Sequence, residues 1–434
     1  MSEIQIRPRV RAAIIQALSA GVVPGQGLQY IQVGRHPEIK AMINAIDTVA
    51  DGGSTFKLIV GDYGAGKTFF LHLVRKICFE KKLVTLHADF SPERRLVASS
   101  GEARNFYSEL IANMSTRSRP DGNALSGVIE AFITDANTQA EKSGEATMKV
   151  IETRLEKLND LVSGYDFSKV VLAYCQGHQE ANDELKQNAI RWLRGEFTTK
   201  IEARKHLDVR TIIDDSMVYD ALKLMKTFVR LAGYSGLLIV MDEAVNLFKI
   251  VNSQSRTSNY EMVLRMLNDT LQSGSGAEGL AILIGVTPEA VFDPRRGICS
   301  YDALASRLAP NKYAERSGLV DMNQPSIHLQ CLTPEELFLL LGNIRSVFAS
   351  SATSCNLIDD DGLKAFMEHC NKAVGAAYFK TPRETVRAFV NLQSMLEQYP
   401  EKTWEEFIGD IAISEDVDES KGGADEDSLE NFKL

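Results

Sequence analysis

The chain has 434 residues, enough for two or three domains and a large hydrophobic core. Its content of 44% hydrophobic and 24% charged residues is that of an ordinary globular protein. A net charge of −10 excludes a protein that coats nucleic acid with its whole surface, although it is compatible with a local basic groove.

The sequence shows no pattern of export or membrane insertion. Residues 1–11 lack an apolar signal core, and no apolar run approaches the roughly 18 residues needed to cross a bilayer. The six cysteines form no C-x-x-C pair, which argues against a zinc site or a disulfide framework. We expect a cytoplasmic protein with reduced thiols and no membrane partner, and no metal site at the adjacent His369 and Cys370.

The N-terminal region, residues 1–29, predicts one short helix around Ile14 to Leu18, broken by a segment with glycine and proline. An amphipathic helix is predicted from Glu38 to Val49. The segment before this second helix has two interpretations. It is either a turn into the helix or the adenine-side wall of a nucleotide site. The residues concerned are Val33, Gly34 and Arg35.

The most informative stretch fits the phosphate-binding pattern G-x-x-x-x-G-K-[ST] at every fixed position. Residues 56–60 before it predict a buried strand, and residues 69–79 after it predict a helix. Glycines let backbone N–H groups approach a phosphate, and the helix N-terminus adds further donors. We expect Lys67 to reach the outer phosphates of ATP and the Thr68 hydroxyl to bind Mg²⁺. The predicted nucleotide-binding residues are Gly61, Asp62, Tyr63, Gly64, Ala65, Gly66, Lys67, Thr68 and Phe69.

A second strand is predicted from Leu83 to Ala88, ending at Asp89, and residues 103–114 predict a helix. Residues from about 115 to 215 carry few strand signals and predict a helical insertion in the core. Its helices are expected over residues 125–138, 146–162, 169–176 and 184–197. One basic run in it is typical of either a solvated face or a nucleic-acid contact. That run consists of Arg191, Arg194, Lys200, Arg204 and Lys205.

After a helix predicted over residues 217–232, an apolar run from Leu237 to Met241 ends in two acids, Asp242 and Glu243. Such a run suits a central parallel strand, and ligands bind at the carboxyl end of strands in open α/β sheets. We expect Asp242 to hold Mg²⁺, directly or through water, and Glu243 to act as the general base toward the attacking water. The alternative is a strand that simply ends in exposed acids.

The next apolar strand, residues 280–286, ends at Thr287, whose hydroxyl is suited to bonding the attacking water or the γ-phosphate. A helix is predicted from Tyr301 to Leu308 and carries Arg307 near its end. The last strand is predicted over residues 327–331.

From Thr333 the pattern predicts helices only. Thr333 and Glu336 form a capping box, with Pro334 at the first helical position. A similar capping pattern recurs at residues 381–384, and it predicts a helix that runs to Gln393 with Arg383 in its first turn.

One more amphipathic helix is predicted over residues 403–411, so we expect a helical lid domain over residues 333–412. From Ser414 onward, eight acidic residues against two lysines give a net charge of −6. Residues 413–434 therefore predict a disordered acidic tail.

The order of these parts resembles an AAA+ ATPase. In that resemblance the phosphate loop is Walker A, the pair Asp242 and Glu243 is Walker B, Thr287 is sensor 1, Arg307 is the arginine finger and Arg383 is sensor 2. Arg295 and Arg296 compete with Arg307 for the finger role. Ala305 to Leu308, followed by residues 327–336, is similar to the origin-recognition branch. More closely, the sequence resembles the BrxD-type ATP-binding proteins of bacterial phage-defence systems such as BREX and Shango. The resembling stretches are residues 33–35, 61–70, 105–110, 241–243, 301–308 and 381–387.

The resemblance implies an α/β fold: an AAA+ phosphate-loop core with a parallel sheet at residues 30–332, a long helical insertion and the helical lid. It implies ATP and Mg²⁺ as cofactors, and a finger that acts on a neighbour's nucleotide implies a homo-oligomer or an assembly with another ATPase. It also implies a defence complex that acts on phage DNA, with a helicase as partner. Two features depart from the pattern. No winged-helix domain is expected after Arg387, and sensor 1 is threonine instead of asparagine.

Three functions are compatible with these motifs. The leading hypothesis is an ATPase that hydrolyses the β–γ bond and converts it into conformational work. The alternative is a nucleotide-gated interaction module with slow or incidental hydrolysis. The Asp242 and Glu243 pair favours hydrolysis, because a purely structural nucleotide site has no need of the glutamate. A small-molecule kinase is the weakest of the three, since such enzymes are usually shorter and lack this order of motifs.

Overall fold

The computed structural model describes residues 5–272, 274–350, 357–374 and 382–409. In this range the chain forms two compact units. One contains the described parts of Met1–His36, Gly61–Leu73 and His328–Leu434, and the other contains Pro37–Val60 and Val74–Ile327. The phosphate loop therefore belongs to the same unit as the N-terminal and C-terminal helices. The acidic tail predicted at residues 413–434 lies outside the described residues.

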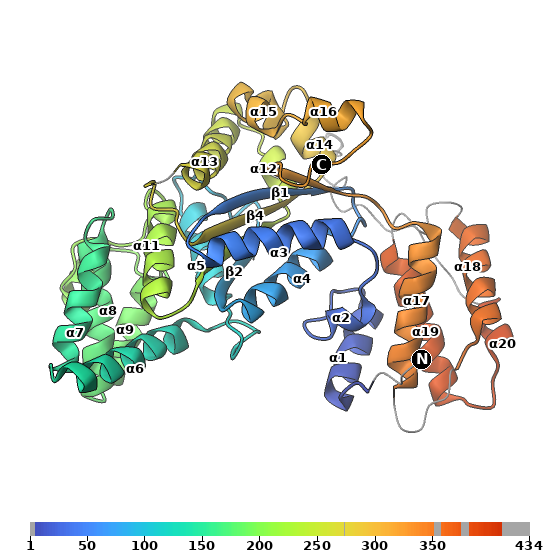
Figure 1. Ribbon diagram of the computed structural model, residues 1–434, viewed down its shortest axis with the longest axis horizontal. Helices are drawn as coiled ribbons and strands as arrows, with labels where there is room; N and C mark the ends of the chain where they lie inside the picture. The colour runs from blue at the N-terminus through green and yellow to red at the C-terminus, as the bar shows by residue number, and fades with distance from the viewer. Residues whose placement is uncertain (1–4, 273, 351–356, 375–381, 410–434) are drawn as a thin grey trace, which may run out of the picture. The chain divides into compact units, whose positions relative to one another are not determined.

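A five-stranded parallel sheet, in the order β2-β3-β4-β1-β5, forms the α/β part of the fold (Figure 1). All five strands that the sequence predicts are present. Each residue of β3 and β4 is buried, as expected for central parallel strands that are covered on both faces. The strands are β1 (Thr55–Gly61), β2 (Leu83–Asp89), β3 (Gly236–Asp242), β4 (Leu280–Val286) and β5 (Ser326–Leu329).

The strand order places β4 between the strand that leads into the phosphate loop and the strand that ends in acids. In the parallel register, Val60 of β1 is opposite Val286 of β4, and Ile284 of β4 is opposite Met241 of β3. Because the strands are parallel, the carboxyl ends of β1, β4 and β3 lie at one edge of the sheet. Thr287, which follows β4, therefore lies between the ends of β1 and β3.

Helices alternate with these strands, as expected for parallel pairs that need crossover connections. The helix predicted from Glu38 to Val49 is α3, and that predicted over residues 217–232 is α11. The helices that accompany the sheet are α3 (His36–Ala50), α4 (Lys67–Glu80), α5 (Glu102–Ala112), α11 (Val218–Leu231), α12 (Val245–Phe248), α13 (Ser253–Leu271), α14 (Pro288–Phe292), α15 (Asp302–Leu308) and α16 (Lys312–Arg316), with a 3-10 turn at Ile298–Ser300.

The insertion between β2 and β3 is helical, as predicted, and α6 to α9 lie together in it (green in Figure 1). The prediction of one helix over residues 146–162 is wrong in its second half. Ser163 has a left-handed φ of 59°, and a Cβ at Gly164 would overlap the carbonyl of Leu158, so the chain turns here and starts α8. The elements are α6 (Leu125–Ser143), α7 (Thr147–Leu155), a 3-10 turn (Glu156–Leu158), α8 (Gly164–Gln179), α9 (Asp183–Leu193) and α10 (Lys200–Leu207).

The other unit combines the N-terminal helices with the C-terminal ones around a single core. Ile14 of α1 is fully buried with Leu337, Phe366 and Phe389 in this core. Arg11 of α1 donates to the carbonyl of Phe348 at 3.2 Å and forms an ion pair with Glu397. The helices are α1 (Pro8–Ser19), α2 (Leu28–Ile31), α17 (Pro334–Ala349), α18 (Asp360–Val374), α19 (Pro382–Gln398) and α20 (Trp404–Ile408).

The predicted capping box starts α17. The N–H of Glu336 donates to the Thr333 hydroxyl at 3.2 Å, and the N–H of Thr333 donates to the Glu336 carboxylate at 3.0 Å. Two of the orphan donors at the helix start are thereby satisfied. The similar device predicted at residues 381–384 begins with Thr381, which lies outside the described residues, and α19 is described from Pro382.

Candidate phosphate-binding site

The phosphate loop lies between β1 and α4, the strand–loop–helix context that its motif requires. The helix begins at Lys67, two positions before the predicted start at Phe69. The N–H groups of Lys67 and Thr68 therefore belong to the first turn of α4, the end of a helix that favours anions. Gly64 and Gly66 adopt left-handed φ angles of 79° and 82°, which side chains rarely allow.

The ammonium of Lys67 is folded over the start of this loop. It donates to the carbonyl oxygens of Gly61 at 2.9 Å and Asp62 at 3.0 Å. A phosphate oxygen carries more negative charge than a carbonyl oxygen, so it is the stronger acceptor for the same ammonium. The loop thus holds a cation together with a row of backbone donors, which is a chemistry suited to polyphosphate.

Arg35 reaches the same loop from the N-terminal segment. Its guanidinium donates to the carbonyl of Ala65 at 2.8 Å and also to the carbonyl of Gln330, which follows β5. Gly34 and Arg35 both have left-handed φ angles, 60° and 63°. The adenine wall proposed for Val33, Gly34 and Arg35 stays a prediction, but the side chain of Arg35 is engaged with the backbone of the loop.

Arg383 of α19 also lies at the phosphate loop. Its Nε donates to the carbonyl of Gly21 at 2.8 Å, and its guanidinium donates to the hydroxyl of Tyr63 at 3.3 Å. Tyr63 occupies a variable position of the loop motif, so the motif alone does not predict the contact between its hydroxyl and Arg383. The first turn of α19 is thereby connected to the loop through a side chain.

The two acids predicted to act on the nucleotide end β3 in the sheet-containing unit. Asp242 is only 5% exposed, and its carboxylate accepts the N–H of Glu243 at 2.9 Å. Glu243 is exposed and has a left-handed φ of 56°, a conformation that costs a residue with a side chain about 1–2 kcal/mol. Asn246 stabilises this turn by donating to the Glu243 carbonyl at 3.2 Å and to the Phe90 carbonyl at 2.8 Å.

Asp89 is a further acid at this edge that the sequence analysis did not single out. It ends β2 and lies opposite Asp242 in the parallel register. Limited solvation at the strand end and the carboxylate of Asp242 raise the pKa of Asp89, against the lowering effect of Arg94; Glu109 raises it further. The sequence could have indicated Asp89 by its position at the end of a mainly apolar strand, which is also the position of Asp242.

The raised pKa of Asp89 predicts a pH-dependent stability. A carboxyl whose pKa is higher in the folded than in the unfolded state favours folding when protonated, and this contribution is lost as pH rises through the folded pKa. We expect Asp89→Asn to raise the melting temperature at pH 7, with a difference from wild type that shrinks toward about pH 4, near the ordinary aspartate pKa. Thermal unfolding of both proteins across this range checks it, and a difference that grows on acidification would contradict it.

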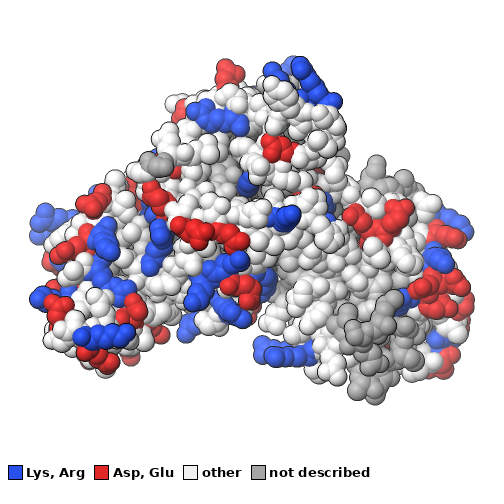
Figure 2. Space-filling model, in the orientation of Figure 1, with Lys and Arg blue, Asp and Glu red and all other residues white. Residues whose placement is uncertain are grey.

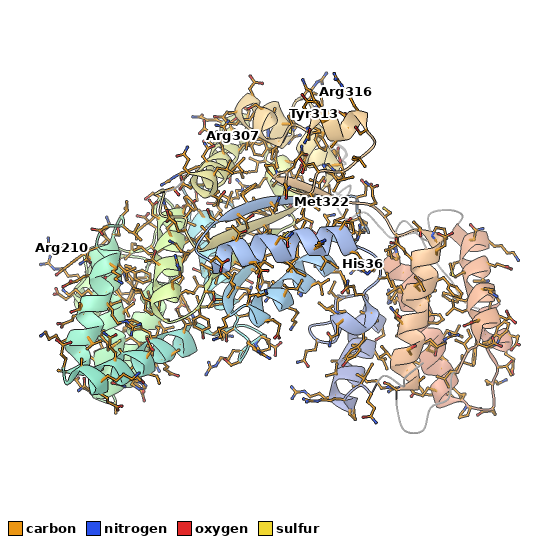
Figure 3. All side chains as sticks on the ribbon, in the orientation of Figure 1. His36, Arg210, Arg307, Tyr313, Arg316 and Met322 are labelled. Atoms are coloured by element: carbon orange, nitrogen blue, oxygen red, sulfur yellow. The ribbon has the colours of Figure 1, made fainter. Side chains whose placement is uncertain are left out.

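Thr287 and Arg307 both have structural partners. The Thr287 hydroxyl accepts the N–H of Ala290 at 3.5 Å as the N-cap of α14, which leaves its own proton available as a donor. Arg307 is exposed (Figure 3). Its Nε donates to the Asn268 side chain at 2.8 Å, and its terminal nitrogen donates to the Ala303 carbonyl at 2.8 Å. These acceptors are neutral, so a phosphate would compete well for the guanidinium.

The two arginines that compete with Arg307 differ from each other. Arg296 donates to the carbonyls of Phe248 and Ile250 at 3.2 and 3.3 Å and lies over the Phe248 ring at 5.3 Å. Its guanidinium therefore stabilises the local fold. Arg295 is exposed, which leaves it as the competitor for the finger role.

The basic run of the insertion does not form one continuous charged face. Arg191 forms an ion pair with Glu202 at 2.9 Å, and Arg194 lies 3.8 Å from Glu196. Basic and acidic side chains are interspersed over the visible face of the insertion (Figure 2). The exposed remainder of the run lies on α10, a helix that the sequence analysis did not predict, and consists of Lys200, Arg204 and Lys205.

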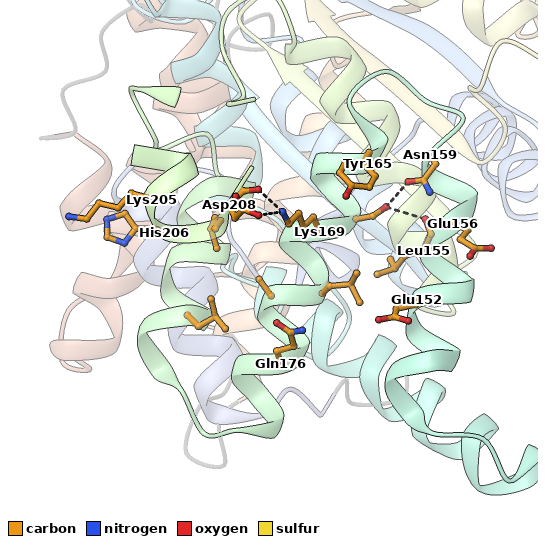
Figure 4. A pocket seen from close by; sticks show the side chains of 15 residues that line it. Glu152, Leu155, Glu156, Asn159, Tyr165, Lys169, Gln176, Lys205, His206 and Asp208 are labelled. Atoms are coloured by element: carbon orange, nitrogen blue, oxygen red, sulfur yellow. Dashed lines mark hydrogen bonds and ion pairs between the residues drawn. The ribbon is translucent and has the colours of Figure 1, made fainter. Parts of the chain in front are cut away.

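An open cavity of about 580 Å³ lies within the insertion among α7, α8 and α10 (Figure 4). Its charges are mixed. Lys169 donates to the carboxylate of Asp208 at 2.5 Å, and Lys205 and His206 share the lining with Glu152 and Glu156. Acids among these cations would repel a polyphosphate, so the phosphate loop is the better candidate for binding a nucleotide.

The structure also describes the features on which the expectations about metal sites and membrane spans depend. Burial raises the pKa of the Cys370 thiol to about 12, so this side chain resembles a small apolar core residue. Among the described residues, no group of three or more His, Cys, Asp or Glu is arranged to hold a metal ion. None of the described helices is long and apolar enough to cross a membrane.

A parallel sheet whose first strand runs into a glycine-rich phosphate loop and a helix, with a separate strand that ends in two acids, defines a P-loop ATP-binding protein of the α/β class. The chain belongs to the family of BREX system ATP-binding proteins BrxC/D, whose model matches residues 6–411. The match takes in the insertion and the C-terminal helices as well as the sheet. The protein is therefore an ATP-binding component of a BREX system. No curated protein matches the chain.

Proposed function

We propose that this protein is a Mg²⁺-dependent ATPase that couples hydrolysis of the β–γ bond to conformational work in a defence complex acting on DNA. The observation that carries the proposal is the sheet topology. β4 separates β1, which leads into the phosphate loop, from β3, which ends at Asp242, and Glu243 follows with an exposed carboxylate. A general base is of use for a chemical step such as hydrolysis, whereas binding alone requires no proton acceptor.

The residues fit Mg²⁺ through their donor set. Magnesium prefers oxygen ligands and is bound in such enzymes by one or two protein oxygens together with substrate phosphates. The Thr68 hydroxyl and the Asp242 carboxylate would hold it. The like charges of Asp89 and Asp242, which raise the pKa of Asp89, are also what a divalent cation would relieve. When bound, the ion would neutralise charge on the β- and γ-phosphates.

The chain's own residues would do the rest of the chemistry. Lys67 and the N–H groups at the start of α4 would bind the outer phosphates. Glu243 would accept the proton of the attacking water, and Thr287 would orient that water or the γ-phosphate by a hydrogen bond. Arg307 from a neighbouring molecule, and Arg383 from the lid, would stabilise the charge that develops on the transferred phosphoryl group.

The most direct test of this proposal is Glu243→Gln. The variant should bind ATP with Mg²⁺ as wild type does but lose hydrolysis by ~10²-fold or more, because the amide cannot accept the proton. Phosphate release and ATP affinity should be measured with Mg²⁺ and with EDTA, in the presence and absence of DNA. Glu289→Gln is the matched control, since Glu289 is an exposed glutamate just beyond the end of β4. Normal turnover in Glu243→Gln would place the base elsewhere.

A second candidate function is the nucleotide-gated interaction module. It is favoured by the contacts of Arg383 with Tyr63 and with the Gly21 carbonyl, because a nucleotide that changes the loop would also change the contacts of α19. In that case ATP would alter the lid and turnover would be incidental. Wild-type ATP binding without measurable hydrolysis, under all the conditions above, would favour this function.

The partners follow from the same proposal. An arginine finger in trans requires a second molecule, either another copy of this chain or a related ATPase, and a helicase is the partner that we propose in the defence complex. DNA contact is proposed for the exposed cations of α10, which should make any binding strongly dependent on salt. We propose that the protein acts in the cytoplasm.

A further inference from the structure

The segment Gln32–Arg35 lies against α17 of its unit. Asn343 of α17 donates to the carbonyl of Gln32 at 3.3 Å. A Cβ on Gly34 would displace the carboxylate of Glu336 in the first turn of α17, and the left-handed φ of 60° at this position also favours glycine. The chain then takes a second left-handed residue at Arg35. These contacts fix the backbone from which the side chain of Arg35 starts.

The guanidinium of Arg35 binds backbone carbonyls in two separate segments. It donates to Ala65 in the phosphate loop at 2.8 Å, and it donates to Gln330 in the segment that joins β5 to α17. The planar guanidinium presents several N–H donors in fixed directions, which an ammonium cannot do. Arg35 is thus a bridge between the loop and the segment that leads into the lid.

The contact with Ala65 has a direct consequence for phosphate binding. In a trans peptide, the C=O and the following N–H lie in one plane and point in opposite directions. Because Arg35 holds the carbonyl of Ala65, it orients the N–H of Gly66 away from itself. Gly66 is exposed, has a φ of 82°, and immediately precedes Lys67. It is therefore one of the donors that the loop motif offers to a phosphate.

We propose that Arg35 is a positioning residue for polyphosphate: it orients the Gly66 N–H and ties the geometry of the phosphate loop to the segment that starts the lid. This inference rests on the proposed function, because it assigns a role to Arg35 in the same phosphate site. It differs from the adenine wall expected from the sequence, because a residue that orients the loop acts on the phosphates whatever base the nucleotide carries.

The test compares ligands that share the polyphosphate and differ in the base. Arg35→Ala should weaken binding of ATP, GTP and inorganic tripolyphosphate by a similar factor, about tenfold or more, as expected for losing hydrogen bonds to a charged donor. Affinities should be measured by calorimetry, or by competition for tripolyphosphate. Arg35→Lys keeps the charge without the planar fork and should be intermediate. Added guanidinium at millimolar concentration should restore part of the affinity of Arg35→Ala, which a merely structural defect would not permit.

The matched control is Arg11→Ala. Arg11 also donates to a backbone carbonyl in this unit, that of Phe348, which lies in α17 and not in the phosphate loop. Its replacement should lower the melting temperature and leave tripolyphosphate affinity unchanged. If Arg35→Ala weakens ATP but not tripolyphosphate, Arg35 is a base contact and the inference is wrong. Unchanged affinity for all three ligands also overturns it. Failure of wild type to bind ATP at all refutes the proposed function instead.

Discussion

Arg307→Ala is expected to leave ATP affinity close to that of wild type and to lower turnover by roughly 10³–10⁵-fold, the value of such fingers in other phosphate-loop enzymes. The guanidinium is exposed and held by neutral acceptors, the Asn268 side chain and the Ala303 carbonyl, which a neighbour's γ-phosphate can replace. Steady-state phosphate release and a separate measurement of ATP binding distinguish the two effects.

Mixing experiments make this prediction specific to a shared site. Arg307→Ala combined with Glu243→Gln should recover part of the activity, because a mixed interface can pair an intact base with an intact finger. Wild-type specific activity should also rise with protein concentration through the range of assembly. Arg316→Ala, which removes another exposed arginine of the same region (Figure 3), is the control, and Arg295→Ala tests the competing finger.

One result would refute the finger. If Arg307→Ala is as active as wild type and specific activity does not change on dilution, Arg307 is a surface residue that stabilises its own helix. The nucleotide-gated module would then be the better description of this protein. A loss of activity in Arg295→Ala alone would instead assign the finger to the loop before α15.

The second large effect is the loss of ATP binding in Lys67→Ala. The ammonium lies 2.9 and 3.0 Å from the carbonyl oxygens of Gly61 and Asp62 at the start of the phosphate loop. Its removal takes away the positive charge that would offset the negative charge of a polyphosphate bound there. We expect affinity to fall on the order of 10²-fold or more, since charge-assisted contacts to phosphate are among the strongest hydrogen bonds. Calorimetry with ATP measures this directly.

The control for Lys67→Ala is Lys81→Ala, just beyond the end of the same helix. Lys81 forms an exposed ion pair with Asp47 at 2.6 Å, and such pairs contribute little to stability. Its replacement should change neither the melting temperature nor ATP affinity appreciably. Wild-type ATP affinity in Lys67→Ala would mean that the phosphate loop is not where the nucleotide binds.

Much of the fold could be predicted from sequence because its signals are local. The central strands β3 and β4 are apolar runs followed by polar residues, and a strand buried on both faces needs no information from distant residues to be recognised. The phosphate loop is equally local, since its glycines, Lys67 and Thr68 act through adjacent backbone groups. The capping box at Thr333 is formed within four residues, and the structure contains it as predicted.

Contacts between distant segments could not be predicted in this way. Asp89 could be recognised as an end-of-strand acid, but its effect on Asp242 depends on β2 and β3 being neighbours in the sheet. The basic run looks continuous in the sequence, yet Glu196 and Glu202 neutralise part of it once α9 and α10 pack. In the sequence, Arg296 and Arg295 are equally good candidates for the finger. Only the structure shows that Arg296 donates to the carbonyls of Phe248 and Ile250.

The sequence by itself determined the class of this protein: a parallel α/β sheet, a phosphate loop, a strand ending in two acids, and helices after residue 333. Only the tertiary structure decided that α1 shares a core with α17 and α19, and that Arg35 and Arg383 reach the phosphate loop from opposite ends of the chain. The physical reason is that backbone propensity and hydrophobic period act over a few residues, whereas the partner of an arginine is set by which segments the burial of apolar surface brings together.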